Sequence, residues 1–219
     1  MKINKRLTKV NFNVANNKEN LYIVIHYVGA TGGAEANCNY FENEYRGASA
    51  HYFVGHAGEI WQCVEDKDIA WHCGANSYKH SKCRNSNSIG IEMCCRNSGG
   101  WYFEPATIAS TIDLVKELMA KYNIPVENVI RHYDVTGKNC PEPYVRSVAD
   151  WNSFKNELVE EEKPMPKKLD NTPDTYAKEA VDWAVKNGVL KGTLEGDYKL
   201  HSNVTRQDVL VFLYRALGK

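Results

Sequence analysis

The feature that most constrains this 219-residue chain is a short run of charges and prolines three quarters of the way along it. The run reads Glu160-Glu161-Glu162-Lys163-Pro164-Met165-Pro166-Lys167-Lys168. Two prolines among charged side chains can neither continue a helix nor build a hydrophobic core. The sequence therefore predicts a domain at residues 1–160, a linker at 161–170 and a smaller unit at 171–219.

The overall composition excludes several classes of protein. The chain has 27 Lys and Arg residues, 27 Asp and Glu residues, and 43% apolar residues. A balanced charge argues against a nucleic-acid partner, and this apolar share is too high for a disordered chain. No apolar run approaches the ~20 residues that cross a bilayer, so we expect a globular protein without a membrane span.

The N-terminal segment is basic, as in a secretion signal, but it lacks the apolar stretch of ~7–15 residues that a signal peptide needs. The first apolar run, Leu21 to Ile25, is short and ends at His26. We therefore expect no signal peptide and synthesis in the cytosol. The seven cysteines form an odd set, which favours free thiols or a metal ligand over a disulfide framework.

Apolar patterning in the first domain alternates between strand and helix periods. Strands are predicted at 21–28, 49–54, 59–64, 88–95 and 128–133, and helices at 34–44, 107–122 and 148–158. This mixture predicts an α/β fold in which a central mixed β-sheet carries flanking helices.

The second unit is predicted to be small and mostly helical, with helices at 176–187 and 204–217. Gly188 can end the first helix, and Thr205 can cap the second. Four apolar residues of the second helix are expected to face inward: Val209, Leu210, Leu213 and Leu217. So short a unit has a marginal core, so we expect it to lean on its neighbour or on a second copy.

Three residues of the first domain could converge on a metal ion. His26 and His132 lie near the ends of predicted strands, and Cys140 follows His132 by eight residues through a loop. Two His and one Cys, with a fourth position left to water, are a catalytic zinc ligand set. The spacing alone does not exclude the alternative that His26, His132 and Cys140 are buried structural residues without a metal.

Several motifs then occur in one order between Leu21 and Leu158, and order makes them more specific than any one alone. They are Ile23-Val24-Ile25-His26-Tyr27, Ser49-Ala50-His51-Tyr52-Phe53-Val54, Gly58-Glu59-Ile60, Ala70-Trp71-His72-Cys73-Gly74, Ser88-Ile89-Gly90-Ile91-Glu92 and the segment from Arg131 to Pro141. Together they resemble the zinc-dependent N-acetylmuramoyl-L-alanine amidases of type 2. That family includes phage and bacterial cell-wall lysins and the peptidoglycan-recognition proteins.

The resemblance implies roles for individual residues. His26, His132 and Cys140 correspond to the ligands of one Zn²⁺ per chain, and Glu92 corresponds to the catalytic acidic residue. Lys138 corresponds to a lysine that meets the oxyanion of the tetrahedral intermediate, and its charge should lower the pKa of Glu92 if the two are close. Two further residues, Trp71 and His72, are candidates for the floor of a substrate groove.

The implied reaction is hydrolysis of the peptidoglycan amide between N-acetylmuramic acid and L-alanine, as in a phage or prophage endolysin of a Gram-positive host. Such a protein, without a signal peptide, is expected in the host cytoplasm until lysis and then at the cell wall. Ala50 stands where some phage members carry a catalytic tyrosine. Non-catalytic recognition relatives usually lack the cysteine ligand, which this chain keeps as Cys140. The alternatives are a recognition module that binds without cutting, a host autolysin, and a hydrolase with a cysteine nucleophile.

The second unit resembles a single S-layer homology module. The likeness lies in 177–192, 196–200 and 204–208, although a usual proline is missing and only one copy is present. It implies binding to a secondary cell-wall polymer, with Arg206 as the best candidate for an anionic ligand. The alternative is a small helical unit that forms a homodimer.

Overall fold

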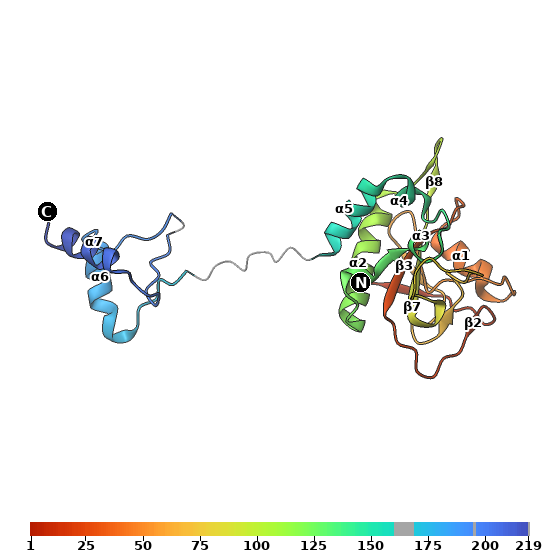
Figure 1. The fold of residues 1–219 in the computed structure, drawn as a ribbon, viewed down its shortest axis with the longest axis horizontal. Coiled ribbons are helices and arrows are strands. Elements are labelled where there is room, and N and C mark those ends of the chain that lie inside the picture. The colour runs from red at the N-terminus through yellow and green to blue at the C-terminus, as the bar shows by residue number, and fades with distance from the viewer. Residues whose placement is uncertain (160–168, 195, 219) are drawn as a thin grey trace. The chain divides into compact units, whose positions relative to one another are not determined.

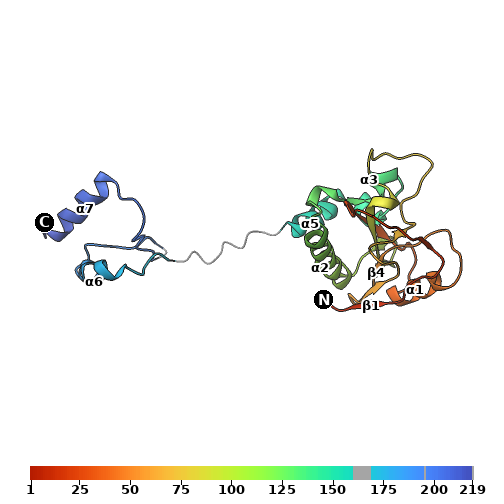
Figure 2. The ribbon, with the colours of Figure 1, turned by 90° about the horizontal axis from the view of Figure 1, so that it is seen from below.

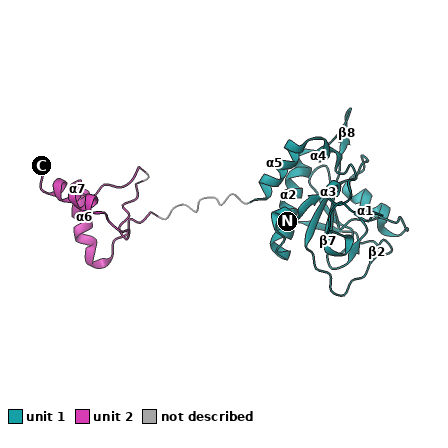
Figure 3. Cartoon of the chain, in the orientation of Figure 1, with its two compact units in different colours: residues 1–160 teal, residues 161–219 magenta. Residues whose placement is uncertain are grey.

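The computed structural model describes residues 1–159, 169–194 and 196–218. It divides the chain into two compact units, Met1–Glu160 and Glu161–Lys219, which Figure 3 shows in separate colours. Most of the predicted linker, residues 161–168, lies outside the described residues. Each unit is considered below by itself.

The first unit is built on one six-stranded sheet with the order β1-β5-β4-β7-β3-β10. Its strands are β1 (Ile3–Lys5), β3 (Tyr22–Tyr27), β4 (Tyr52–Val54), β5 (Ile60–Gln62), β7 (Ser88–Met93) and β10 (Val129–Arg131). Only the β4–β5 pair is antiparallel among these pairs. The predicted α/β fold with a central mixed sheet is therefore confirmed.

Along the two central strands, β3 and β7, successive side chains point alternately to the two faces of the sheet, and these faces differ in polarity. Ile23 and Ile25 of β3, with Ile89 and Ile91 of β7, belong to the main hydrophobic core. The residues between them point to the opposite face, where β3 carries His26. The same period of two that builds the core thus presents polar side chains on the other face.

Helices cover both faces of this sheet. On the main-core face lie α2 (Pro105–Tyr122) and α5 (Val148–Leu158), whose apolar residues pack into the same cluster. On the other face, α1 (Ala34–Glu42) packs Ala34 and Cys38 into a second, smaller cluster. Figure 1 labels these helices, and Figure 2 shows α2 and α5 on one side of β4 and α1 on the other.

The boundaries of α2 follow from local chemistry. Pro105 occupies the first turn, where its missing N–H costs nothing, and Asn123 ends the helix in the left-handed conformation with φ 52°. Two short helices, α3 (His132–Thr136) and α4 (Glu142–Arg146), precede α5. Two small ribbons complete the unit: β2 (Phe12–Asn13) with β6 (Ile69–Ala70), and β8 (Arg96–Asn97) with β9 (Trp101–Tyr102).

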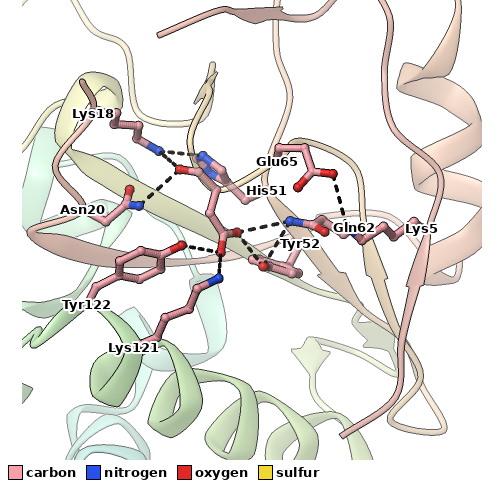
Figure 4. Close-up of polar contacts among 10 residues, drawn as sticks. Lys5, Lys18, Asn20, His51, Tyr52, Gln62, Glu65, Lys121 and Tyr122 are labelled. Atoms are coloured by element: carbon pink, nitrogen blue, oxygen red, sulfur yellow. Dashed lines mark hydrogen bonds and ion pairs between the residues drawn. The ribbon is translucent and has the colours of Figure 1, made fainter. Parts of the chain in front are cut away.

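A buried carboxylate, Asp66, joins the sheet to α2. Figure 4 labels the four side chains that donate to it, Tyr52, Gln62, Lys121 and Tyr122. The Tyr52 hydroxyl donates to Asp66 Oδ1 over 2.5 Å, and the Gln62 amide donates to the same oxygen over 3.2 Å. From α2, Lys121 Nζ and the Tyr122 hydroxyl reach Asp66 Oδ2 over 2.9 and 2.7 Å. One side chain therefore joins β4, β5 and the end of α2.

Element ends differ from the sequence prediction at several places. The strands predicted at 49–54 and 59–64 are shorter, as β4 and β5. The strand predicted at 128–133 ends at Arg131, because His132 already begins α3. The Asp134 carboxylate accepts from the Arg131 backbone N–H over 2.9 Å, which favours the start of a helix at this point.

The second unit contains α6 (Lys178–Lys186) and α7 (Arg206–Ala216). Both helices were predicted, as were their boundary residues: Gly188 follows α6 with φ +70°, and the Thr205 hydroxyl accepts from the Asp208 N–H. The predicted inward face of α7 is wrong, because Val209, Leu210, Leu213 and Leu217 are between 41% and 72% exposed. In residues 169–194 and 196–218, Val189 is the one buried hydrophobic residue, so no core covers these side chains.

Two whole-chain features complete the description. No helix among the described residues has the length and apolar character to cross a bilayer. All seven cysteines are buried and unpaired in the described part of the chain.

Candidate active site

The site forms where three parallel strands end side by side. The register pairs His26 of β3 directly with Glu92 of β7, and it pairs Ile25 with Arg131 of β10. His132, the next residue after Arg131, therefore arrives beside His26. The rings of His26 and His132 have centroids 4.7 Å apart. Carboxyl ends of parallel strands are a common place for ligand sites, because the strands deliver side chains to one edge.

Cys140 reaches the same place by a return loop. After α3, Gly137 turns the chain in the left-handed region with φ 85°, a conformation that costs glycine little. The Tyr133 N–H then donates to the Cys140 carbonyl over 2.7 Å, which holds the loop against α3. Cys140 Sγ consequently lies 3.7 Å from His26 Nδ1.

The donor atoms of His26, His132 and Cys140 all lie within 4.8 Å of one another. Tetrahedral zinc with Zn–S near ~2.3 Å and Zn–N near ~2.05 Å places sulfur and nitrogen about 3.6 Å apart. The observed 3.7 Å between Cys140 Sγ and His26 Nδ1 agrees with that geometry. In addition, His132 Nδ1 and Glu92 Oε2 are buried without a hydrogen-bond partner among the described residues, as expected where an ion and its water would supply one. The donor set therefore fits zinc.

Electrostatics in the site favour neutral imidazoles. Burial, reinforced by neighbouring His72, His132 and Lys138, holds the pKa of His26 well below its ordinary value. Burial and Lys138 lower the pKa of His132 to about 4. Both rings therefore keep a lone pair near pH 7. Burial raises the pKa of the Cys140 thiol to about 12, a shift that a bound cation would oppose.

Glu92 sits beside the donor set, with Oε1 3.9 Å from His26 Nδ1. Its pKa is raised to about 8 by burial, while the Lys138 ammonium lowers it. The sequence prediction had the sign of the Lys138 contribution right, but the net direction is upward because desolvation outweighs the lysine. A carboxyl group in such surroundings changes protonation state more easily near neutral pH than an exposed one.

Two adjoining cavities open onto these residues. One of about 300 Å³ is lined by the three donor residues and by Glu92 and Lys138. The other, of about 740 Å³, shares His132, Lys138, Trp71 and His72 with it and extends past Asn76 and Asn85. Lys138 thus lies on both cavities, from an exposed position in the loop that leads to Cys140.

The two aromatic candidates occupy different positions. Trp71 is half-buried on the wall of both cavities, and its indole N–H donates to Asn13 Oδ1 over 2.5 Å. His72 is buried, and both its ring nitrogens are engaged within the protein, with His26 Nε2 and with Ser88 Oγ. Its contact with a substrate would therefore be through ring carbons.

Sequence reasoning gave no role to Ser88 or Asn85, which the structure places around His72. Asn85 Oδ1 accepts the backbone N–H groups of His72 and Cys73 over 3.2 and 2.8 Å. A serine at the start of a strand and an asparagine in a turn are too common to stand out in a sequence. Arg206 belongs to the second unit, where it is the exposed first residue of α7.

Comparison with known proteins agrees with this geometry. Residues 16–143 match the family described as N-acetylmuramoyl-L-alanine amidase. The chain is 34% identical over 150 residues to the N-acetylmuramoyl-L-alanine amidase BlyA of Bacillus subtilis, a match that covers 62% of this chain and 40% of that protein. It is 31% identical over 199 residues to the amidase CwlH of the same species, covering 88% and 70% respectively. The match to BlyA, and to several other curated relatives, thus spans only about two fifths of their length.

Solved structures give the same relationship for the first unit. The catalytic domain of XlyA superposes with a TM-score of 0.60 at 29% identity, covering 72% of this chain and 99% of that domain. PlyL superposes with a TM-score of 0.62 at 28% identity, covering 72% and 97%.

Proposed function

The chain belongs to the N-acetylmuramoyl-L-alanine amidase family, and on that premise we propose that it is a zinc-dependent peptidoglycan hydrolase. Its substrate would be the amide that joins N-acetylmuramic acid to the L-alanine of the stem peptide, as in a lytic enzyme of phage or prophage origin. The single observation that supports this most is the convergence of His26, His132 and Cys140 beside Glu92.

The three donors would hold one Zn²⁺, which supplies a Lewis acid and lowers the pKa of a coordinated water to ~7. Glu92 would accept a proton from the attacking water and return it to the leaving amine of L-alanine. The pKa of about 8 belongs to Glu92 in the metal-free site, where burial raises it; a bound Zn²⁺ would lower that pKa and favour the carboxylate that accepts the proton. The amide would break between the carbonyl carbon of the lactyl group and the alanine nitrogen.

Lys138 would stabilise the oxyanion that forms on the lactyl carbonyl oxygen. The support is its position on the wall of both cavities, two residues before Cys140, from which its ammonium group would reach the carbonyl of a bound substrate. Position 50 is an alanine and not the tyrosine that some phage relatives carry. We therefore assign the proton transfer to Glu92 and the charge stabilisation to Lys138. The larger cavity, with Trp71 on its wall, would accommodate the parts of the substrate that flank the amide, the muramic acid and the stem peptide.

The test of this proposal combines metal content with hydrolysis of purified cell walls. The full chain should bind one zinc per molecule, release peptides with a new N-terminal alanine, and lose this activity on chelation but not on treatment with iodoacetamide. His26→Ala should lower the bound zinc well below one per chain and abolish hydrolysis. Glu92→Gln should keep the metal and lose the rate.

Two of the alternatives have their own outcomes in the same assay. Wall binding without release of alanine N-termini would mean a recognition module. Inactivation by iodoacetamide, with activity unaffected by chelation, would mean a cysteine nucleophile.

For the second unit we propose binding to an anionic secondary polymer of the cell wall, which would hold the enzyme near its substrate. The support is the exposed guanidinium of Arg206 at the start of α7 and the resemblance to an S-layer homology module. Full-length protein carrying Arg206→Ala should bind purified walls more weakly, with its rate on a soluble muramoyl-peptide unchanged. Unchanged wall binding together with a dimer in solution would favour an oligomerisation unit.

A further inference from the structure

A chain of three hydrogen bonds runs from His26 away from the candidate metal donors. His26 Nε2 lies 3.0 Å from His72 Nδ1. His72 Nε2 lies 3.2 Å from Ser88 Oγ, and the Ser88 hydroxyl lies 2.6 Å from the backbone carbonyl of Arg84. His26, His72 and Ser88 are all buried.

The last bond in this chain fixes the direction of the others. A backbone carbonyl can only accept, so the Ser88 hydroxyl donates its one proton to Arg84. Ser88 Oγ can then only accept from His72, which places the His72 proton on Nε2. A neutral imidazole carries one N–H, so His72 Nδ1 accepts, and the proton of His26 lies on Nε2.

This tautomer leaves His26 Nδ1 without a proton. Nδ1 is the atom that lies 3.7 Å from Cys140 Sγ and 3.9 Å from Glu92 Oε1, on the side of the candidate metal centre. The opposite tautomer would place a hydrogen where a ligand must offer a lone pair. Partners behind a metal-binding histidine commonly select its tautomer in this way.

The surrounding backbone is shaped to keep the His72 ring in place. Gly90 of β7 lies beneath the ring, where an added Cβ would come within 2.4 Å of His72 Cγ. Asn85 Oδ1 accepts the backbone N–H of His72, which fixes the start of the side chain. Gly90 on one side of the ring and the hydrogen bond from the His72 backbone N–H to Asn85 on the other leave the ring little freedom to rotate.

We propose that Ser88 and His72 are positioning residues that orient His26 through a relay ending at the Arg84 carbonyl, so that Nδ1 is the ligating atom. The proposal rests on the proposed function and extends it by two residues that need not touch the substrate. It predicts both the tautomer of His26 in the metal-free chain and the affinity for zinc.

The tautomer is tested first, on full-length protein labelled with ¹⁵N at histidine and freed of metal. Long-range ¹H–¹⁵N spectra distinguish protonated from non-protonated ring nitrogens. Both His26 and His72 should show a protonated Nε2 and a non-protonated Nδ1. A His26 protonated at Nδ1 in the parent chain would overturn the relay.

Zinc affinity is then measured by competition with a chromogenic chelator in three variants. His72→Phe keeps a ring but removes both hydrogen bonds, and it should weaken zinc binding about 10–100-fold. His72→Asn can return an acceptor oxygen near the place of Nδ1, and it should recover most of that loss. Ser88→Ala should give His26 a mixture of tautomers and weaken binding, while the exposed neighbour Ser81→Ala serves as the matched control and should change nothing.

The outcomes separate this inference from the proposed function. A parent chain that binds no zinc would refute the zinc proposal, whereas the tautomer measurement needs no metal and still decides the relay. Parent affinity in His72→Phe, or equal losses in His72→Phe and His72→Asn, would refute the relay while the zinc enzyme stands. Should His72→Phe fail to fold, Ser88→Ala decides by the same two measurements.

Discussion

Replacing Asp66 by alanine tests whether one buried carboxylate holds the sheet to α2. Four side chains donate to this group, but the free-energy cost of losing the acceptor differs among them, because some can bond water instead and others cannot. Lys121 is 56% exposed and can turn to water, as can the half-buried Tyr122. Tyr52 and Gln62 are at most 4% exposed, so their donors would remain buried with one fewer acceptor.

The magnitude follows from those two buried donors. An unsatisfied buried donor costs ~1–3 kcal/mol, and Gln62 keeps part of its bonding because its amide also reaches the Tyr52 oxygen over 3.2 Å. We therefore expect Asp66→Ala to lower the free energy of unfolding by about 3 kcal/mol. With a urea m-value of ~2 kcal/mol/M, the midpoint should fall by about 1.5 M.

The assay is urea unfolding followed by tryptophan fluorescence, since four of the five tryptophans lie in the first unit. The control is Glu65→Gln, which removes only the exposed 3.1 Å ion pair with Lys5 and should cost under ~0.5 kcal/mol. Equal midpoints for Asp66→Ala and Glu65→Gln would refute the reasoning.

Three further changes test other parts of the structure. Lys138→Met should keep one zinc per chain and lower kcat about 100–1000-fold; a rate near the parent value in a wall-hydrolysis assay would remove Lys138 from the chemistry. Gly90→Ala should displace the His72 ring and weaken zinc binding about tenfold, measured by chelator competition, and unchanged affinity would show that the ring moves aside freely. Burial raises the pKa of the Cys94 thiol from 9.0 to about 12, so the stability it contributes is complete below pH 9 and is lost as pH rises toward 12. At pH 10 the loss is about 1.4 kcal/mol, which is about 0.7 M urea at an m-value of ~2 kcal/mol/M; Cys94→Ala should reduce the decline of the urea midpoint between pH 8 and 10 by that concentration, and a parallel decline in both proteins would contradict it.

The sequence by itself indicated five of the six strands of the main sheet, the three longer helices of the first unit, both helices of the second unit and the candidate metal donors, whereas β1, α3 and α4 were not predicted. Ile23, Ile25, Ile89 and Ile91 mark buried strands through a period of two, and the same period assigns His26 and Glu92 to the opposite face. Motif order, rather than spacing, singled out His132 and Cys140 from the other histidines and cysteines. Both kinds of signal, the local periodicity and the order of motifs along the chain, can be recognised in the sequence without a structure.

Tertiary structure decided whatever depends on which groups face one another. The register of β3 with β7 places Glu92 beside His26 in a desolvated pocket, so burial, and not the Lys138 charge, sets the direction of the Glu92 pKa. The bonds from His26 through His72 to Ser88 join three separate segments, and no spacing rule connects them. The exposure of Leu210 and Leu213 could not be predicted from the helical period either. Periodicity identifies an apolar face of a helix, but it does not show whether another element covers that face.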